Sequence, residues 1–292
     1  MNPVFATKEQ AEKLLGENDV YTMNLKPFEL KAKLQTVEEV TTEDYLSHAR
    51  NQALDWSDDY KQKVNSALDE ISLNLSINPM PLPDEVIFVM TTGLEEAGAA
   101  YTRGNAVFLN NRMIHQNRHF SRLIAHELVH VATRNNSNWK TRLYSTIGFQ
   151  PCKIPSFSDE FQDFLFSNPD APLIQHSLEL TFKGIKQRVS PIIFTRNNEY
   201  VGGRFFDYIE TGLFLLDGLN ETEYELFPEE KRIIPFDECQ EFFQHVGRNT
   251  NYLFHAEEIL ADNIADIYTG RVEFPSPNIV RKILNVLNVE SF

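Results

Sequence analysis

Residues 117–134, NRHFSRLIAHELVHVATR, decide the fold that we expect for this chain. Apolar residues recur in this stretch at spacings of four, four and three, the pattern of one buried helix face: Phe120, Ile124, Leu128 and Val131. The same stretch holds the string His126-Glu127-Leu128-Val129-His130, which has the form HExxH. The sequence therefore predicts an amphipathic helix that carries this motif.

The spacing of the motif has a mechanical meaning. Residues four apart on a helix lie one above the other, so His126 and His130 can reach one metal ion from the same face. Glu127 lies about 100° round the helix, where its carboxylate can reach a water molecule held by the metal. We interpret the string as a metal site with Glu127 as its base. The alternative is a solvent-facing helix with two ordinary histidines.

A catalytic zinc takes three protein ligands and leaves one position to water, so a third ligand is needed. The extended pattern HExxHxxGxxH would require Gly at 133 and His at 136, where this chain has Thr133 and Asn136. The nearby upstream cysteine of peptide deformylases is also missing, because Cys152 follows the motif. A carboxylate on a second helix remains, and we predict that it is Glu258.

The segment around Glu258 supports this choice through its periodicity. Glu258, Asp262 and Asp266 share one helical stripe, opposite an apolar stripe formed by Leu260, Ile264 and Ile267. Burial of the apolar side would point the acidic edge towards the histidine helix. Such a row of carboxylates repels itself unless a cation or a hydrogen-bond donor neutralises it.

At these residues the chain resembles the gluzincin metallopeptidases, the thermolysin-like clan in which HExxH is completed by the Glu of an ExxxD segment. The resemblance implies that His126, His130 and Glu258 bind Zn²⁺, that Glu127 is the general base and then acid, and that Asp262 orients one ligand histidine. It also implies a small mixed sheet stacked on the HExxH helix, with a helical half across the cleft. The run YTRGNAVFLN (101–110) would supply a cleft-edge strand that pairs with an extended substrate.

We expect an α+β, zincin-like fold in four segments. Residues 1–57 form a mostly helical lead-in, and residues 58–150 form the upper catalytic half, with the sheet and the HExxH helix. Residues 151–250 are an insertion of mixed α/β character, and residues 251–292 form the lower half with the third-ligand helix. Since Glu258 lies 128 positions after His130, the insertion must fold out of the way.

The donor that stabilises the oxyanion is left open by the sequence. In the clan it is a Tyr or His, usually downstream of the third ligand, where only Tyr268 remains among tyrosines. Further candidates lie upstream, and each of them taken singly is interpreted first as structural: Tyr200, Tyr208, His245, Tyr252 and His255. His255, three residues before Glu258, is also a possible fourth ligand that would close the site, although we favour it as a hydrogen-bonding neighbour near the helix start.

Composition restricts the partners and the location. The chain has 292 residues and a formal charge of −15, which disfavours nucleic acid and anionic membranes as partners. Two cysteines make no disulfide framework, and no apolar run has the length of a membrane span. We expect a cytoplasmic protein, or one exported without a classical signal peptide. The sequence does not indicate an oligomeric state.

From these observations we predict a zinc metallopeptidase. We expect it to be an endopeptidase that hydrolyses a peptide or protein substrate with metal-activated water. Two alternatives stay open. One is a non-catalytic module in which structural zinc pins two helices together, and the other is a zinc amide hydrolase that acts on a non-protein substrate. The physiological substrate is set by cleft pockets that the sequence does not locate.

Overall fold

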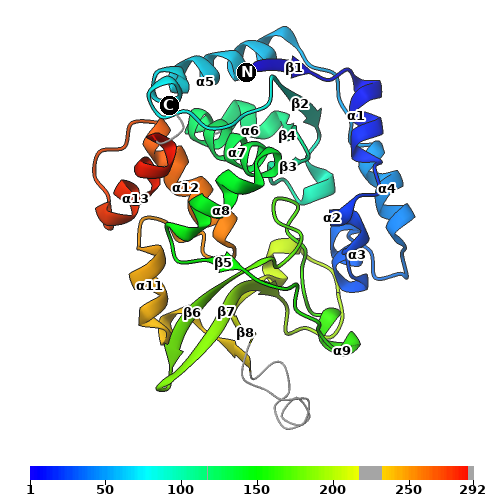
Figure 1. Ribbon diagram of the computed structural model, residues 1–292. Coiled ribbons are helices and arrows are strands. Elements are labelled where there is room, and N and C mark those ends of the chain that lie inside the picture. The colour runs from blue at the N-terminus through cyan, green and yellow to red at the C-terminus, as the bar shows by residue number, and fades with distance from the viewer. Residues whose placement is uncertain (117, 217–231, 289–292) are drawn as a thin grey trace.

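Four short strands form the sheet that supports the HExxH helix. A computed structural model describes residues 1–116, 118–216 and 232–288 (Figure 1). The strands are β1 (Asn2–Phe5), β2 (Glu85–Thr91), β3 (Tyr101–Arg103) and β4 (Ala106–Asn110), in the spatial order β1-β2-β4-β3. β1, β2 and β4 are parallel, whereas β3 is the antiparallel edge strand and joins β4 through a turn at Gly104 with φ of +59°. The mixed sheet predicted from the sequence is confirmed.

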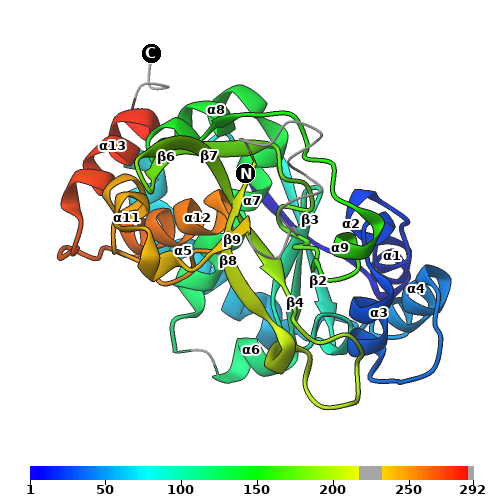
Figure 2. The ribbon, with the colours of Figure 1, turned by 90° about the horizontal axis from the view of Figure 1, so that it is seen from below.

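Both faces of this sheet are covered, which explains why β2 reads as an unbroken apolar run. Phe88 and Met90 face the main core with the HExxH helix, and Val89 faces a second core with the N-terminal helices. Those N-terminal helices are α1 (Lys8–Leu15), α2 (Val20–Met23), α3 (Pro27–Leu34) and α4 (Thr42–Arg50). Figure 2 shows them on one side of the sheet and α5 and α7 on the other.

The upper half contains the HExxH helix that the sequence predicts, together with further helices. α5 (Asp58–Ile77) ends where the proline-rich stretch 78–85 begins, and α6 (Asn111–Gln116) follows β4. The HExxH helix is α7 (Phe120–Asn135), and Asn117, where we expected it to start, lies outside the described residues. Asn136 directly follows α7, and its side chain accepts a hydrogen bond from the Trp139 backbone N–H at 2.9 Å, which caps α8 (Ser137–Ser145).

A second, antiparallel sheet lies below the first in Figure 1. Its order is β5 (Gln150–Pro151), β6 (His176–Phe182), β7 (Ile185–Phe194), β8 (Glu210–Leu215) and β9 (Ile233–Ile234). The short helix α9 (Asp159–Gln162) lies between β5 and β6 in the chain, and α11 (Gln240–Val246) packs beside β6. The 3₁₀ turns Leu94–Glu96, Phe205–Tyr208 and Phe236–Glu238 lie in connecting segments. The chain then continues into α12 (Ala256–Tyr268), which packs on α7, and α13 (Pro277–Asn288), which packs on α8.

The packing of α12 on α7 determines the geometry of the site. Leu260 and Ile264 of α12 and Ile124 and Leu128 of α7 are all fully buried in the main core. When these apolar stripes are buried, the edge of α7 that carries the two histidines faces the edge of α12 that carries Glu258, as the positions of the stripes predict. Within the described residues, no helix combines the length and the apolar character that a membrane crossing requires.

The first strand of the sheet is among the elements that the sequence analysis missed. Strand β1 lies inside the N-terminal stretch, which is otherwise helical as expected, and it pairs with β2 from Asn2 opposite Glu85 to Phe5 opposite Phe88. Its four residues are too few to show a period. The division of the chain into four segments stays a prediction.

Burial of α12 gives a first prediction, on stability. Leu260→Ala removes a fully buried side chain from the α7–α12 contact and should lower the free energy of unfolding by about 2–5 kcal/mol. The matched control is Leu73→Ala on α5, because Leu73 is 68% exposed, and it should change that free energy by at most about 0.5 kcal/mol. Urea denaturation in the presence of a chelator measures both. Equal effects of the two substitutions would contradict this account of the core.

Candidate metal centre

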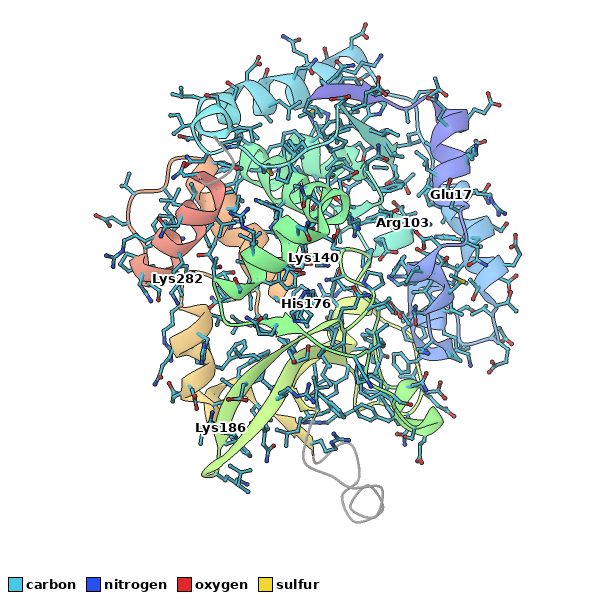
Figure 3. The ribbon with its side chains drawn as sticks, in the orientation of Figure 1. Glu17, Arg103, Lys140, His176, Lys186 and Lys282 are labelled. Carbon is cyan, nitrogen blue, oxygen red and sulfur yellow. The ribbon has the colours of Figure 1, made fainter. Side chains whose placement is uncertain are left out.

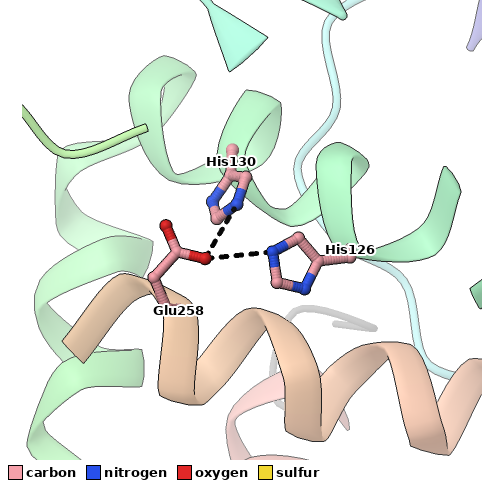
Figure 4. A group of neighbouring side chains, drawn as sticks. All are labelled: His126, His130 and Glu258. Carbon is pink, nitrogen blue, oxygen red and sulfur yellow. Dashed lines mark hydrogen bonds and ion pairs between the residues drawn. The ribbon is translucent and has the colours of Figure 1, made fainter. Parts of the chain in front are cut away.

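Three side chains that the sequence singled out converge between α7 and α12. His126 and His130 come from α7 and Glu258 comes from α12 (Figure 4). The Nε2 atom of His126 lies 3.1 Å from Oε2 of Glu258, and the Nε2 atom of His130 lies 3.7 Å from the same oxygen. One ligand atom from each residue lies within 4.8 Å of the other two, and all three residues are buried. This arrangement can hold a metal ion.

Hydrogen bonding around His126 fits such an ion. Its Nδ1 lies 3.1 Å from Oδ1 of Asp262, and its Nε2 faces Glu258, so both ring nitrogens are directed at carboxylates. A neutral imidazole has only one N–H to donate, so both hydrogen bonds together require the charged form. An ion at Nε2 would remove that requirement, because Nδ1–H would still donate to Asp262. Asp262 therefore fixes the orientation of the His126 ring.

The second imidazole is arranged in the same way, by a residue that the sequence analysis did not identify. The Nδ1–H of His130 donates to Oε1 of Glu257 at 3.1 Å, and Glu257 also accepts from Thr133 Oγ1 and from the Tyr144 hydroxyl. The Nε2 atom of His130 is fully buried and has no hydrogen-bond partner. A buried nitrogen that faces a carboxylate but has no hydrogen-bond partner fits a site in which a metal ion binds that nitrogen.

The outer side of Asp262 is held by a separate network. Its Oδ2 accepts from Thr250 Oγ1 at 2.5 Å, and Arg122 lies 3.0 Å from its Oδ1. Arg122 also donates to Asp266 at 2.5 Å, and Asp266 in turn accepts from Arg271 at 2.6 Å. Two arginines therefore compensate the acidic stripe of α12 at its Asp262–Asp266 end, whereas Glu258 at the other end faces the two imidazoles.

The insertion does not fold out of the way, and in this respect the expectation was wrong. Residues 166–171 pass over the centre, where Asn168 Nδ2 donates to Oε1 of Glu258 at 2.7 Å. Two residues later, Asp170 lies 4.0 Å from Nε2 of His130 and accepts from the Thr102 backbone N–H at 2.7 Å. The stretch NPDAP (168–172) signals a turn, but nothing in its pattern relates it to the histidines.

Glu127 lies beside the three converging residues rather than among them. Its Oε2 accepts a hydrogen bond from Thr102 Oγ1 of the edge strand β3 at 2.7 Å. The ligand atoms of Glu127, His130 and Asp170 also lie within 4.8 Å of one another. The carboxylate of Glu127 is thus placed next to the position where a fourth group would complete the centre.

The carboxylates of the cluster shift the pKa values of its histidines in the direction that favours positive charge. Burial alone would lower the pKa of His126, but hydrogen bonds to Asp262 and Glu258 raise it well above 6.5. Burial likewise opposes the charged form of His130, whereas the charges of Asp170 and Glu258 raise its pKa to about 8. Burial raises the pKa of Asp170 itself to about 8. The carboxylates thus draw protons into the site, and a divalent cation supplies the same charge there.

A cavity of about 1120 Å³ opens onto the centre. His126, Glu127 and Glu258 line it, together with Tyr252, whose ring centroid is 6.2 Å from that of His126. Desolvation and the charges of Glu258 and Asp262 raise the pKa of Tyr252 above 10, so its hydroxyl keeps its proton. Of the residues left open for an oxyanion donor, Tyr252 is the one in the cavity wall.

The remaining candidates are engaged elsewhere. The N–H of Glu257 donates to His255 Nδ1 at 2.9 Å, so His255 caps α12 and is not among the converging ligands. The others have these neighbours: the Tyr200 and Tyr208 hydroxyls donate to the carbonyls of Gly203 and Gly202, the Tyr268 hydroxyl donates to the carbonyl of Asn78, and His245 packs against Gly148.

The contact of Glu257 with His130 predicts an effect on metal affinity. Glu257→Gln keeps the shape of the side chain but removes the charge that orients the imidazole, so the affinity for zinc should fall by about 10- to 100-fold. Competition with a chromophoric chelator measures this affinity. Glu238→Gln, at an exposed position, is the control and should leave it unchanged. Equal affinities of the two variants would show that Glu257 does not support the ligand.

Comparison with known families places the histidine motif in a described domain. A family model, the eCIS core domain, matches residues 94–138. The match includes β3, β4, α7 and the three motif residues His126, Glu127 and His130, and it ends before Glu258. No curated protein and no solved structure matches the chain. The matched segment is thus the one that holds two of the three converging side chains.

Proposed function

We propose that this protein is a zinc metallopeptidase of the gluzincin type that cleaves peptide bonds within a peptide or protein substrate. The observation that carries the proposal is the convergence of His126, His130 and Glu258 at the cavity, with Glu127 beside them. Two imidazoles and one carboxylate are the donor set of many catalytic zinc sites. The resemblance of HExxH and ExxxD to the gluzincins points to the same assignment.

Zinc suits these donors because it accepts nitrogen and carboxylate oxygen together in a four-coordinate site. When bound, zinc supplies Lewis acidity, which lowers the pKa of a water molecule from 15.7 to about 7 and polarises a carbonyl group. Asp262 and Glu257 would hold the two imidazoles with Nδ1 protonated and Nε2 directed at the ion, and Asn168 would hold the second oxygen of Glu258.

Glu127 is assigned the proton transfers. Its carboxylate lines the cavity and is held on one side by the Thr102 hydroxyl, which leaves its other oxygen for the attacking water. In this role Glu127 takes a proton from water as the water attacks the carbonyl carbon, and then passes it to the leaving amine. No covalent bond between enzyme and substrate is required.

Tyr252 is assigned the stabilisation of negative charge on the carbonyl oxygen. It stands in the cavity wall beside His126 and keeps its phenolic proton, so it can donate to an oxyanion. It lies upstream of Glu258 in the chain, whereas the clan usually places this donor downstream. The side chain in the cavity, rather than its order in the sequence, supports the assignment.

The form of the cavity favours an extended substrate over a small amide. Its volume of about 1120 Å³ exceeds the usual range of small-molecule pockets, and β3, an edge strand, borders the centre through Thr102. An edge strand pairs readily with an extended peptide. A module with zinc closed by His255 has less support, because His255 uses its Nδ1 at the helix start.

Substitution of the base tests the proposed function. Zinc-loaded protein should cleave members of a mixed peptide library, chelator should abolish the cleavage, and added zinc should restore it. Glu127→Gln should lower kcat by about 10²- to 10⁴-fold, because it removes the base, while zinc stays bound. Mass spectrometry of the library and metal analysis of the same samples give both results.

The control for this experiment is Glu70→Gln, because Glu70 is a second carboxylate of the same cavity wall outside the metal centre. It should keep kcat within about threefold of the parent. If Glu127→Gln cleaves as fast as the parent protein, the assigned base is wrong. Cleavage that persists in chelator would overturn the metal mechanism itself.

A further inference from the structure

The segment Phe166–Ala171 of the insertion is anchored on both sides of the metal centre. The Phe166 N–H donates to the carbonyl of Ile193 on β7 at 2.9 Å, and the Ser167 N–H donates to Oε2 of Glu29 on α3 at 3.1 Å. On the other side, Arg134 of α7 donates to the carbonyl of Pro169 at 2.8 Å. These contacts hold the segment above the converging ligands rather than leaving it to solvent.

Asp170 lies at the end of this segment, against two parts of the site. Its Oδ1 accepts from the Thr102 N–H of the edge strand and lies 4.0 Å from Nε2 of His130. That nitrogen is fully buried and has no hydrogen-bond partner, so it points at the proposed position of the metal ion. Asp170 and Glu127 face the same position, because their ligand atoms and that of His130 lie within 4.8 Å of one another.

We propose that Asp170 is a fourth protein ligand of the metal centre and that it occupies the position which catalysis requires for water. This inference rests on the proposed function. The centre in the described conformation is then closed, and the unmodified enzyme cleaves slowly because the segment Phe166–Ala171 must move before water can bind. A zinc ion with four protein ligands has no coordination position left for water.

Charge supports a ligand role for Asp170. Three carboxylates surround the two imidazoles, namely the buried Glu127 and Glu258 and the half-buried Asp170. Such a group is costly inside a protein unless positive charge compensates it. A divalent ion in contact with Asp170 and Glu258 cancels two of the three charges directly.

The same carboxylate also occupies the edge of the sheet. The residues of β3 are buried in the described structure, and Arg103 donates to the carbonyl of Glu17 at 2.7 Å (Figure 3). A substrate that pairs with β3 needs the Thr102 N–H that Asp170 now uses. One displacement of Asp170 therefore frees both the position for water and a donor for the substrate backbone.

Water proton relaxation of the Co²⁺-loaded protein tests this inference on the unmodified chain. An exchangeable water on paramagnetic Co²⁺ speeds the relaxation of bulk water, and a centre closed by Asp170 has none. We expect the Co²⁺-loaded protein to relax water little faster than the Zn²⁺-loaded protein does. A clear enhancement in the unmodified protein, as large as one bound water gives, would overturn the inference.

The matched variants are Asp170→Asn and Asp163→Asn, the second at an exposed position of the same insertion. Asn at 170 can still accept from the Thr102 N–H but loses the charge. Asp170→Asn should therefore gain the relaxation enhancement and lose affinity for zinc by at least about 10- to 100-fold, while Asp163→Asn should match the parent in both. Unchanged relaxation and affinity in Asp170→Asn would also overturn the inference.

Cleavage of the peptide library by the same proteins separates this inference from the proposed function. If both hold, Asp170→Asn cleaves faster than the parent at saturating zinc. If Asp170→Asn gains a water but cleaves nothing, the fourth ligand stands and the peptidase proposal fails. If the parent cleaves fast with a water already on the metal, the peptidase proposal stands and the fourth ligand fails.

Discussion

One carboxylate oxygen of Glu258 faces the Nε2 atoms of two buried imidazoles, and the rest of the structure depends on this contact. Buried ionisable groups are tolerated only where partners compensate them. Each buried group has a hydrogen-bond partner: Asp262 and Glu257 for the histidines, Asn168 for Glu258, and Thr102 for Glu127. The apolar stripes of α7 and α12 fix the separation at which all these contacts form.

The parts of the site that lie on long helices could be predicted from the sequence, because a helix fixes the direction of each side chain. His126, Glu127 and His130 follow from one turn of α7, and the position of Asp262 one turn after Glu258 places both on one edge of α12. The strands β3 and β4 likewise lie in YTRGNAVFLN (101–110), the run from which a cleft-edge strand was expected. Burial on both faces makes such runs conspicuous.

Other parts depend on contacts between distant segments, which no local pattern encodes. Asn168 and Asp170 lie in an irregular turn, and only tertiary packing against α3, α7 and β7 brings them to the histidines. Glu257 had a weak signal as the neighbour of Glu258, but its direction towards His130 depends on how far α12 is rotated against α7. The same packing around residues 166–171 links the N-terminal helices and the inserted sheet to the centre, although neither carries a recognisable motif.

The claim on which the account rests is that one divalent ion binds between α7 and α12. Anomalous X-ray diffraction from crystals of the zinc-loaded protein, recorded on both sides of the zinc absorption edge, tests it most directly. The account predicts one strong peak at about 2.0–2.2 Å from Nε2 of His126, Nε2 of His130 and a carboxylate oxygen of Glu258. Zinc bound only at other places, or a peak that omits Glu258, would contradict it.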